Sequence, residues 1–171
     1  MPLSVRVAAV VEYPEVARLT VAAYEALVGP ERLFGYRDEL EDVAGRAAAG
    51  TVLVAVDGAD AVLGAVTYVP GPRTPLSEFD DDDACGIRML AVDPARQGGG
   101  AGRALTVACI ERAQADGRGR IVLHSTSAME IARGMYERLG FERTPRRDVI
   151  VPSEDLAGEA PLHLMAYELV L

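Results

Sequence analysis

The stretch "VDPARQGGGAGRAL", residues 92–105, places four glycines within five positions just before a helical pattern. Glycine destabilises a helix interior and adds no side chain to a core, so this concentration needs another reason. The apolar segment at 85–92 predicts a strand, and the periodic small and apolar residues from Ala101 onward predict a helix. Unpaired amides and the helix dipole at such a junction favour an anion, with Arg96 and Arg103 adding positive charge. The sequence therefore predicts a phosphate-binding turn.

Two familiar phosphate-binding patterns do not fit this turn. The dinucleotide pattern G-x-G-x-x-G fails whether it begins at Gly98 or at Gly100. A P-loop needs a lysine, and all 17 basic residues of the chain are arginine. Both observations disfavour a nucleotide-binding domain of the Rossmann type. The pattern that does fit is Gln97-x-x-Gly100-x-Gly102.

Strands and helices alternate outward from the turn. The pattern predicts strands at 4–11, 51–56, 61–69, 85–92 and 120–125, one more after 141–146, and a last one at 162–171. It predicts helices at 14–28, at 31–48, from 101 to near 117, and from a capping box at 127–130 to Gly140. In that box Ser127 is the expected N-cap and Glu130 the third helical residue. We expect a mixed α/β fold with helices on both faces of the sheet, in a single domain over residues 1–171.

Composition excludes several classes of function. The net charge of −9 argues against nucleic-acid binding, and no apolar run approaches the roughly 20 residues that span a membrane. Cys85 and Cys109 lie far apart without metal-ligand spacing, so we expect reduced thiols, no metal and a cytoplasmic protein. His124 and His163 are expected to be structural.

The glycine turn, preceded by Val92-x-Pro94, resembles the [Arg/Gln]-x-x-Gly-x-[Gly/Ala] signature of the GNAT superfamily of N-acetyltransferases. The segment "MYERLGF" at 135–141 is similar to a second signature of that family. The resemblance covers nearly the whole chain and is strongest at 85–145. It implies a mostly antiparallel central sheet of six to seven strands and acetyl-CoA as co-substrate.

The resemblance also implies roles for the turn and for the strand before it. The strand backbone would pair with the pantetheine arm, and the turn amides would hold the pyrophosphate of CoA. The strand residues are Leu90, Ala91 and Val92, and the turn residues are Gln97, Gly98, Gly99, Gly100, Ala101, Gly102 and Arg103.

The chemistry that the resemblance implies is direct attack by an amine on the acetyl group in a ternary complex. Tyr136 stands where the family places the acid that protonates the departing thiolate, and a tyrosine packed in the core is the other interpretation. The acceptor is a small-molecule amine or a protein N-terminus. The sequence leaves its identity open, together with the length of the acyl group and a homodimeric state.

Gly86 occupies the position at which many relatives carry a glutamate base. Three alternatives follow: water removes the proton, a carboxylate arrives from elsewhere, or the amine binds already neutral. The same departure supports an alternative function, a non-catalytic acyl-CoA-binding or sensor module.

Two further features have competing interpretations. The acidic run "FDDDDA" at 79–84 is either a solvated loop or a rim that attracts a cationic substrate. Tyr24, on the first helix, either lines the acceptor site or packs in the core.

Overall fold

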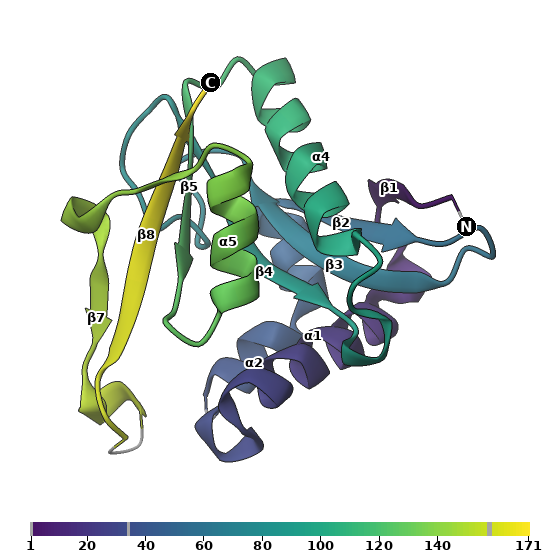
Figure 1. Cartoon of the computed structure of the whole chain (residues 1–171), viewed down its shortest axis with the longest axis horizontal. Coiled ribbons are helices and arrows are strands. Elements are labelled where there is room, and N and C mark those ends of the chain that lie inside the picture. Colours follow the sequence, from purple (N-terminus) through teal and green to yellow (C-terminus); the bar gives the residue numbers. More distant parts are fainter. Residues whose placement is uncertain (1, 34, 157–158) are drawn as a thin grey trace.

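The computed structural model describes residues 2–33, 35–156 and 159–171, and a central sheet organises them (Figure 1). Its strands are β1 (Ser4–Val7), β2 (Thr51–Val56), β3 (Val62–Val69), β4 (Ala84–Val92), β5 (Arg120–Ser125), β6 (Glu142–Arg143), β7 (Val149–Val151) and β8 (Leu162–Val170). The order is β1-β2-β3-β4-β5-β8-β6, and β7 pairs with β8. Among these strands only β4 and β5 are parallel, which confirms the mixed, mostly antiparallel sheet. The sheet has eight strands instead of six to seven because β6 and β7 are short additional strands against β8.

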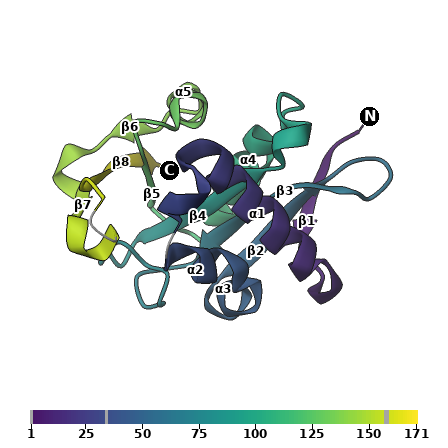
Figure 2. The same cartoon turned by 90° about the horizontal axis from the view of Figure 1, so that it is seen from below.

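Helices cover both faces of the sheet. They are α1 (Tyr13–Val28), α2 (Tyr36–Glu41), α3 (Val43–Ala49), α4 (Ala101–Ala115) and α5 (Glu130–Arg138). Figure 2 shows α4 and α5 on one side of the sheet and α2 and α3 on the other. This layering confirms the expected α/β architecture.

The alternating side chains of β2 show how one sheet serves two cores. Val52, Val54 and Val56 are buried in the core that includes α1 and α3. Leu53 and Ala55 point the other way, into the core that includes α4 and α5. Strand periodicity of two residues thus predicts both layers from one segment.

Strand β4 carries the irregularity that shapes the candidate site. It pairs with β5 only over Ala84–Ile87, and beyond that point the two strands diverge (Figure 1). Met89 has φ +53°, a conformation that non-glycine residues rarely adopt, and the register with β3 gains one extra residue there. This β-bulge packs Met89 among α1 and α2 while Leu90 and Val92 pack on the α4 side.

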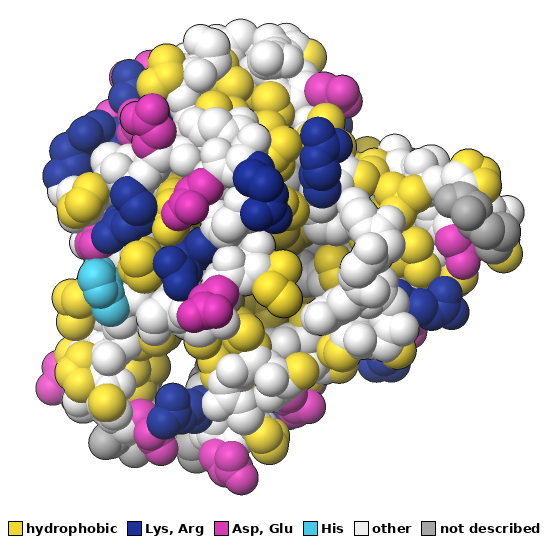
Figure 3. All heavy atoms as spheres, in the orientation of Figure 1, with side chains coloured by type: hydrophobic (Ala, Val, Ile, Leu, Met, Phe, Trp, Pro, Cys, Tyr) yellow, Lys and Arg dark blue, Asp and Glu magenta, His cyan; other side chains and the backbone are white. Residues whose placement is uncertain are grey.

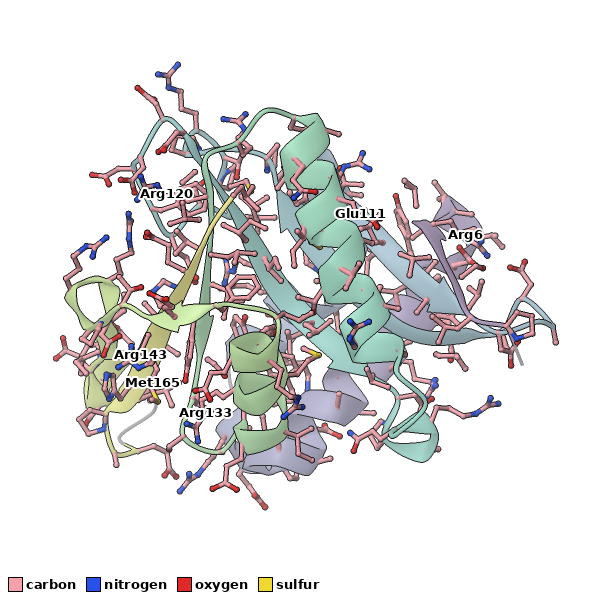
Figure 4. The ribbon with its side chains drawn as sticks, turned by 45° about the horizontal axis from the view of Figure 1, so that its top comes forward. Arg6, Glu111, Arg120, Arg133, Arg143 and Met165 are labelled. Atoms are coloured by element: carbon pink, nitrogen blue, oxygen red, sulfur yellow. The ribbon has the colours of Figure 1, made fainter. Side chains whose placement is uncertain are left out.

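The expected strand at 4–11 is shorter in the structure. β1 ends at Val7, and residues 10–12 form a turn of 3-10 helix. The Glu12 carboxylate accepts hydrogen bonds from the Ala9 amide at 2.7 Å and from Arg6 of β1 at 2.7 Å (Figure 4). These local bonds satisfy the backbone and favour the turn over a longer strand.

The expected helix at 31–48 is two helices, α2 and α3. Asp42 separates them with a non-helical ψ of 67°, and its carboxylate accepts a hydrogen bond from the Gly45 amide at 2.8 Å. A carboxylate that caps the second helix therefore interrupts the first.

The predicted capping box at Ser127 and Glu130 is wrong. Helix α5 begins at Glu130, its N-cap is Met129, and no side chain caps it. The Met129 amide instead closes a turn on the Thr126 carbonyl at 3.1 Å, and Arg133 donates to the Ser127 carbonyl at 3.2 Å (Figure 4). The predicted stop at Gly140, φ +97°, agrees with the end of α5 at Arg138.

The packing of α4 on the sheet yields a stability prediction. Leu105 is fully buried in the core beneath α4, so Leu105→Ala should lower the free energy of unfolding by about 2–5 kcal/mol. Ile131, 84% exposed on α5, is the control, and Ile131→Ala should stay within about 0.5 kcal/mol. Urea denaturation followed by circular dichroism measures both. Equal losses for the two variants would contradict the described core.

Candidate active site

The glycine turn lies open on the surface between β4 and α4. Gly98 and Gly100 have φ values of +87° and +84°, which only glycine adopts without strain. A Cβ atom at either position would meet nothing within 4 Å, so packing inside the chain does not require these glycines. Their absent side chains leave the backbone accessible from solvent.

The first turn of α4 supplies amide donors at the same place. Gly100 is the N-cap, and Ala104 is the first residue whose amide bonds back to it, at 3.0 Å. Within the described chain the amides of Ala101, Gly102 and Arg103 have no acceptor. Free donors, the positive end of a helix of 15 residues and accessible backbone make a site for an anion.

Ion pairs and a capping bond hold the entrance of this turn. The Asp93 carboxylate accepts from the Ala95 amide at 2.9 Å and pairs with Arg18 of α1 at 2.7 Å. Arg96 approaches Asp57 to 3.7 Å, while Arg103 is exposed beside the turn. The turn is therefore positioned by the fold, and positive charge lies next to it.

The two sequence signatures meet in space. Gly102 lies 3.5 Å from Val92 of β4 and 3.8 Å from the sulfur of Met135 of α5, measured from a Cβ at that glycine. Leu90 and Val92 pack against the same core as Met135. Within the described residues no strand pairs with β4 beyond Ile87 on its β5 side. The strand, the turn and α5 thus border one opening in the sheet.

Tyr136 lies at the inner wall of this opening and is 5% exposed. Its ring packs against Phe141 and Tyr167, with centroids 5.6 and 6.5 Å away. Its hydroxyl has no hydrogen-bond partner among residues 2–33, 35–156 and 159–171. Burial raises the pKa of Tyr136 well above its usual value, so the hydroxyl stays protonated.

Phe79 fills the space above Gly86. A Cβ at Gly86 would lie 2.7 Å from the Phe79 ring and 3.3 Å from the Val122 carbonyl oxygen. A glutamate at this position, which the resemblance leads one to expect, would require the Phe79 ring to shift. The same loop instead delivers Glu78, which lines a small hollow together with Arg88 and His124.

Glu78 joins the two strands at the point where they diverge. Arg88 and His124 are the first residues beyond the last β4–β5 pair. The Glu78 carboxylate lies 3.4 Å from the Arg88 guanidinium and 2.8 Å from Nδ1 of His124. His124 Nε2 lies 2.9 Å from the Arg147 carbonyl oxygen. Because both partners of the ring are acceptors, this arrangement favours the protonated form of His124, in which both ring nitrogens donate.

The pKa values of this pair agree with the geometry. Burial lowers the pKa of His124, but the hydrogen bonds to Glu78 and to the Arg147 carbonyl outweigh it, and the net pKa is raised. Burial raises the pKa of Glu78, but His124 and Arg88 outweigh it, and the net pKa is lowered. The contacts of His124 therefore favour its charged form, and its ring joins Glu78 to the Arg147 carbonyl.

Two tyrosines and a buried arginine surround Arg88 on the α1 and α2 side. Tyr24 and Tyr36 have ring centroids 5.9 Å apart and pack beside Met89. Burial raises the pKa of each, although Arg88 opposes the rise. Arg46 of α3 is 2% exposed and donates to Thr67 Oγ1 at 3.1 Å. Tyr24 thus lies near the candidate site and also packs in a core, so the structure is compatible with both interpretations of this residue.

The acidic run is occupied by ion pairs. Asp81, Asp82 and Asp83 lie within 2.5, 3.1 and 3.2 Å of Arg147, Arg73 and Arg120 respectively. These carboxylates join loops at the start of β4, the end away from the glycine turn. Three of the four aspartates of the run are therefore paired with arginines, and Asp80 is exposed. Cys85 and Cys109 are buried free thiols, and burial raises the pKa of both, to about 11 and about 12.

Sequence reasoning missed Glu78, Arg88, Arg46 and the Met89 bulge. One signal was available: Arg88 is a single charge inside the apolar strand "CGIRMLAV", and a buried charge needs a partner. Glu78 lies in the loop before β4 and Arg46 lies on α3, and no local pattern connects either side chain to Arg88.

The surface near the site is open and carries mixed charge. Figure 3 shows a gap at the lower left, where Figure 1 places the lower end of β8 beside α2. Arg32 before α2 and Glu159 before β8 approach to 3.6 Å. Basic and acidic side chains are interspersed over this face (Figure 3).

In the part of the chain that the structure describes, no helix has the length and apolar character to cross a membrane, and no group of three or more ligand side chains forms a metal site.

The chain is similar to known acetyltransferases in sequence. The model of the Acetyltransferase (GNAT) family matches residues 14–141. The mycothiol acetyltransferase of Renibacterium salmoninarum is 28% identical over 145 residues, which cover 82% of this chain and 36% of that protein. The mycothiol acetyltransferase of Actinosynnema mirum is 35% identical over 91 residues, 53% of this chain and 28% of that protein. The chain spans only 17–36% of the length of such curated relatives.

Solved structures agree in fold over almost the full chain. The ribosomal-protein-alanine N-acetyltransferase from Brucella melitensis matches with a TM-score of 0.72 at 21% identity, covering 98% of this chain and 99% of that chain. A GNAT family acetyltransferase from Brucella melitensis in complex with acetyl-CoA matches with a TM-score of 0.62 at 26% identity, covering 82% of this chain and 83% of that one.

The ion pair at the strand divergence yields a titration prediction. We expect the pKa of His124 to lie above its ordinary value of 6.5. Glu78→Gln should lower this pKa, because burial still lowers it while the carboxylate that raises it has been removed. NMR of the two histidine side chains measures both titrations. His163, which pairs with Asp148 instead, is the internal control. The same His124 titration in both proteins would contradict the pairing.

Proposed function

This chain belongs to the GNAT family of acetyltransferases, and from that premise we propose that it transfers an acetyl group from acetyl-CoA to an amine, a small molecule or a protein N-terminus, by direct attack in a ternary complex. The observation that carries the proposal is the open glycine turn at the start of α4, which lies beside the divergence of β4 and β5. The exposed glycine turn and the adjacent divergence of the strands support this proposal, because one extended ligand can contact both.

The residues present fit acetyl-CoA as the donor. In this proposal the amides from Gln97 to Arg103 hold the pyrophosphate, since they lack acceptors in the described structure and residues 97–100 are exposed. The free side of β4 at Leu90, Ala91 and Val92 pairs with the pantetheine arm in the manner of an added strand. Bound in this way, acetyl-CoA supplies the activated acetyl group at the strand divergence.

Tyr136 is the proposed general acid for the departing thiolate. Its hydroxyl stays protonated at neutral pH, and it lies beside β4 and α4 without a competing hydrogen bond in the described residues. The raised pKa makes the hydroxyl a weaker acid. The same apolar surroundings also raise the pKa of the thiol, so the difference between the two pKa values stays small enough for proton transfer.

The reaction also requires the amine to lose a proton. Glu78 is the carboxylate that reaches the site in place of position 86, but its lowered pKa makes it a weak base. Arg88, Arg46 and His124 instead surround the site with positive charge, which disfavours an ammonium ion. We infer that the amine reacts as the neutral species after losing its proton to water.

A non-catalytic acyl-CoA-binding module is the alternative function. It shares the donor site and differs in the role of Tyr136. An observation favouring it is the absence of a glutamate at position 86. Binding and turnover therefore need separate measurements.

The donor site predicts a matched pair of glycine variants. Gly100 and Gly117 lie at opposite ends of α4, both have positive φ, and a Cβ at either would meet nothing within 4 Å. Gly100→Glu should weaken acetyl-CoA binding at least tenfold because it sets a carboxylate against the phosphates. Gly117→Glu carries similar strain and should bind as the parent does. Calorimetry measures both, and equal affinities would overturn the donor site.

The general acid predicts a second matched pair. Tyr136→Phe should lower kcat by about 10²–10⁴-fold and leave acetyl-CoA affinity intact. Tyr167→Phe removes a neighbouring buried hydroxyl that donates to Glu137 at 3.3 Å, and kcat should change little. Release of free CoA with an amine panel provides the rate. Unchanged turnover in Tyr136→Phe would exclude the acid role, and a parent protein that binds acetyl-CoA without turnover would favour the binding module.

A further inference from the structure

We propose that the amine acceptor carries an oxyanion, such as a carboxylate or a phosphonate, a short carbon chain away from its amine, and that Arg88 binds it with Arg46 behind. This inference rests on the proposed function, since it concerns the acceptor of the same site. It replaces the cationic acceptor that the acidic run suggested.

Arg46 is a buried charge without a countercharge. It is 2% exposed, and no carboxylate of the described chain lies within 4 Å of its guanidinium. Within the described residues its hydrogen bonds go to neutral oxygens, Thr67 Oγ1 at 3.1 Å and the Leu40 carbonyl at 2.9 Å, and its buried Nε has no partner among them. A buried guanidinium is costly unless it is paired, so an anion near it is the missing element.

Arg88 is connected to Arg46 through Thr67. Thr67 of β3 lies directly opposite Arg88 of β4, so their side chains share the α1 and α2 face of the sheet. The Arg88 side chain is 16% exposed, donates a long hydrogen bond to the Leu76 carbonyl at 3.5 Å and interacts with the Tyr36 hydroxyl. Its nearest carboxylate contact is Glu78, and at 3.4 Å this contact is long for a charge-assisted hydrogen bond. A guanidinium has five donors, so part of its planar edge remains available for an oxyanion.

The charges around this point do not balance. Among the described residues the Glu78 carboxylate contacts Arg88 and His124, and no carboxylate contacts Arg46. Glu39, Asp42 and Asp148 act on these groups only from beyond contact distance, so the two guanidinium groups have one contacting carboxylate between them, inside a chain whose net charge is −9. A cationic acceptor such as a polyamine would be repelled here, whereas an oxyanion would be attracted.

Neighbouring hydroxyls add neutral donors. Tyr24 and Tyr36 face each other across α1 and α2, and burial keeps both hydroxyls protonated. Tyr36 lies on α2, the helix beside the opening in Figure 3. A small acceptor that enters there meets hydroxyl donors and Arg88 before it reaches the strand divergence.

The test compares ligands that differ only in the anionic group. The probes are N-acetylglycine, N-acetylalanine and N-acetylmethionine, each beside its neutral amide, with N-acetylaminomethylphosphonate as the phosphonate source. Calorimetry with CoA present measures their binding as reaction products. We expect at least one acid or the phosphonate to bind about tenfold or more tightly than its neutral counterpart, as a charge-assisted bond requires. The stronger of the two anions identifies the source.

Variants locate the contact. Arg88→Gln should abolish the preference for the anion while acetyl-CoA binding is retained. Arg37→Gln is the control, because Arg37 lies on α2, is 40% exposed and pairs with Glu25 and Glu41 outside the cluster. Circular dichroism confirms that each variant folds. Arg88→Lys, which keeps the charge and loses the bidentate edge, should retain part of the preference.

The outcomes separate the two proposals. If acids and amides bind equally, or if Arg88→Gln keeps the preference, the oxyanion proposal is overturned while the donor site stands. If none of the anionic probes binds although acetyl-CoA does, it is likewise overturned. Loss of acetyl-CoA binding in the parent protein would overturn the proposed function instead.

Discussion

Strands β4 and β5 share four residue pairs and then part, and the rest of the candidate site depends on this divergence. The β-bulge at Met89 adds one residue to β4 immediately afterwards, in a conformation with positive φ that costs energy for a side chain of this kind. The surrounding core, which packs Met89 between α1 and α2, maintains that conformation. As a result the far half of β4 is paired on one edge only, and the proposed donor lies against a rigid strand and not against a mobile loop.

Charge is distributed against the overall balance of the molecule. The acidic run that dominates the sequence near residue 80 is paired with arginines at the start of β4, away from the glycine turn. Behind the divergence lie Arg46, Arg88 and His124, and among the described residues Glu78 is the carboxylate that contacts Arg88 and His124. Net charge therefore describes the solvated surface, whereas the site depends on a few groups in a low-dielectric environment where each charge counts for more.

Position 86 illustrates how one exchange of residues changes the proposed chemistry. Glycine at this position leaves space for the Phe79 ring, and the same loop then brings Glu78 to the point where β4 and β5 diverge. A carboxylate held by an imidazolium and a guanidinium remains ionised and weakly basic. The site thus combines a weak base with surplus positive charge, which suits an amine that arrives neutral and an acceptor that carries its own anion.

The sequence by itself determined the layers and the glycine turn before α4, because these depend on periodicity and on local backbone requirements that residues within a few positions report. The family followed from the resemblance of two short motifs to known signatures. Local reasoning failed at Ser127 and across 31–48, where Asp42 and the turn before Met129 compete for the same backbone groups. Only the tertiary structure decided the bulge at Met89 and the cluster of Glu78, Arg88, His124 and Arg46. These four residues come from a loop, two strands and a helix, and their charges interact only after the sheet has brought them within a few ångströms.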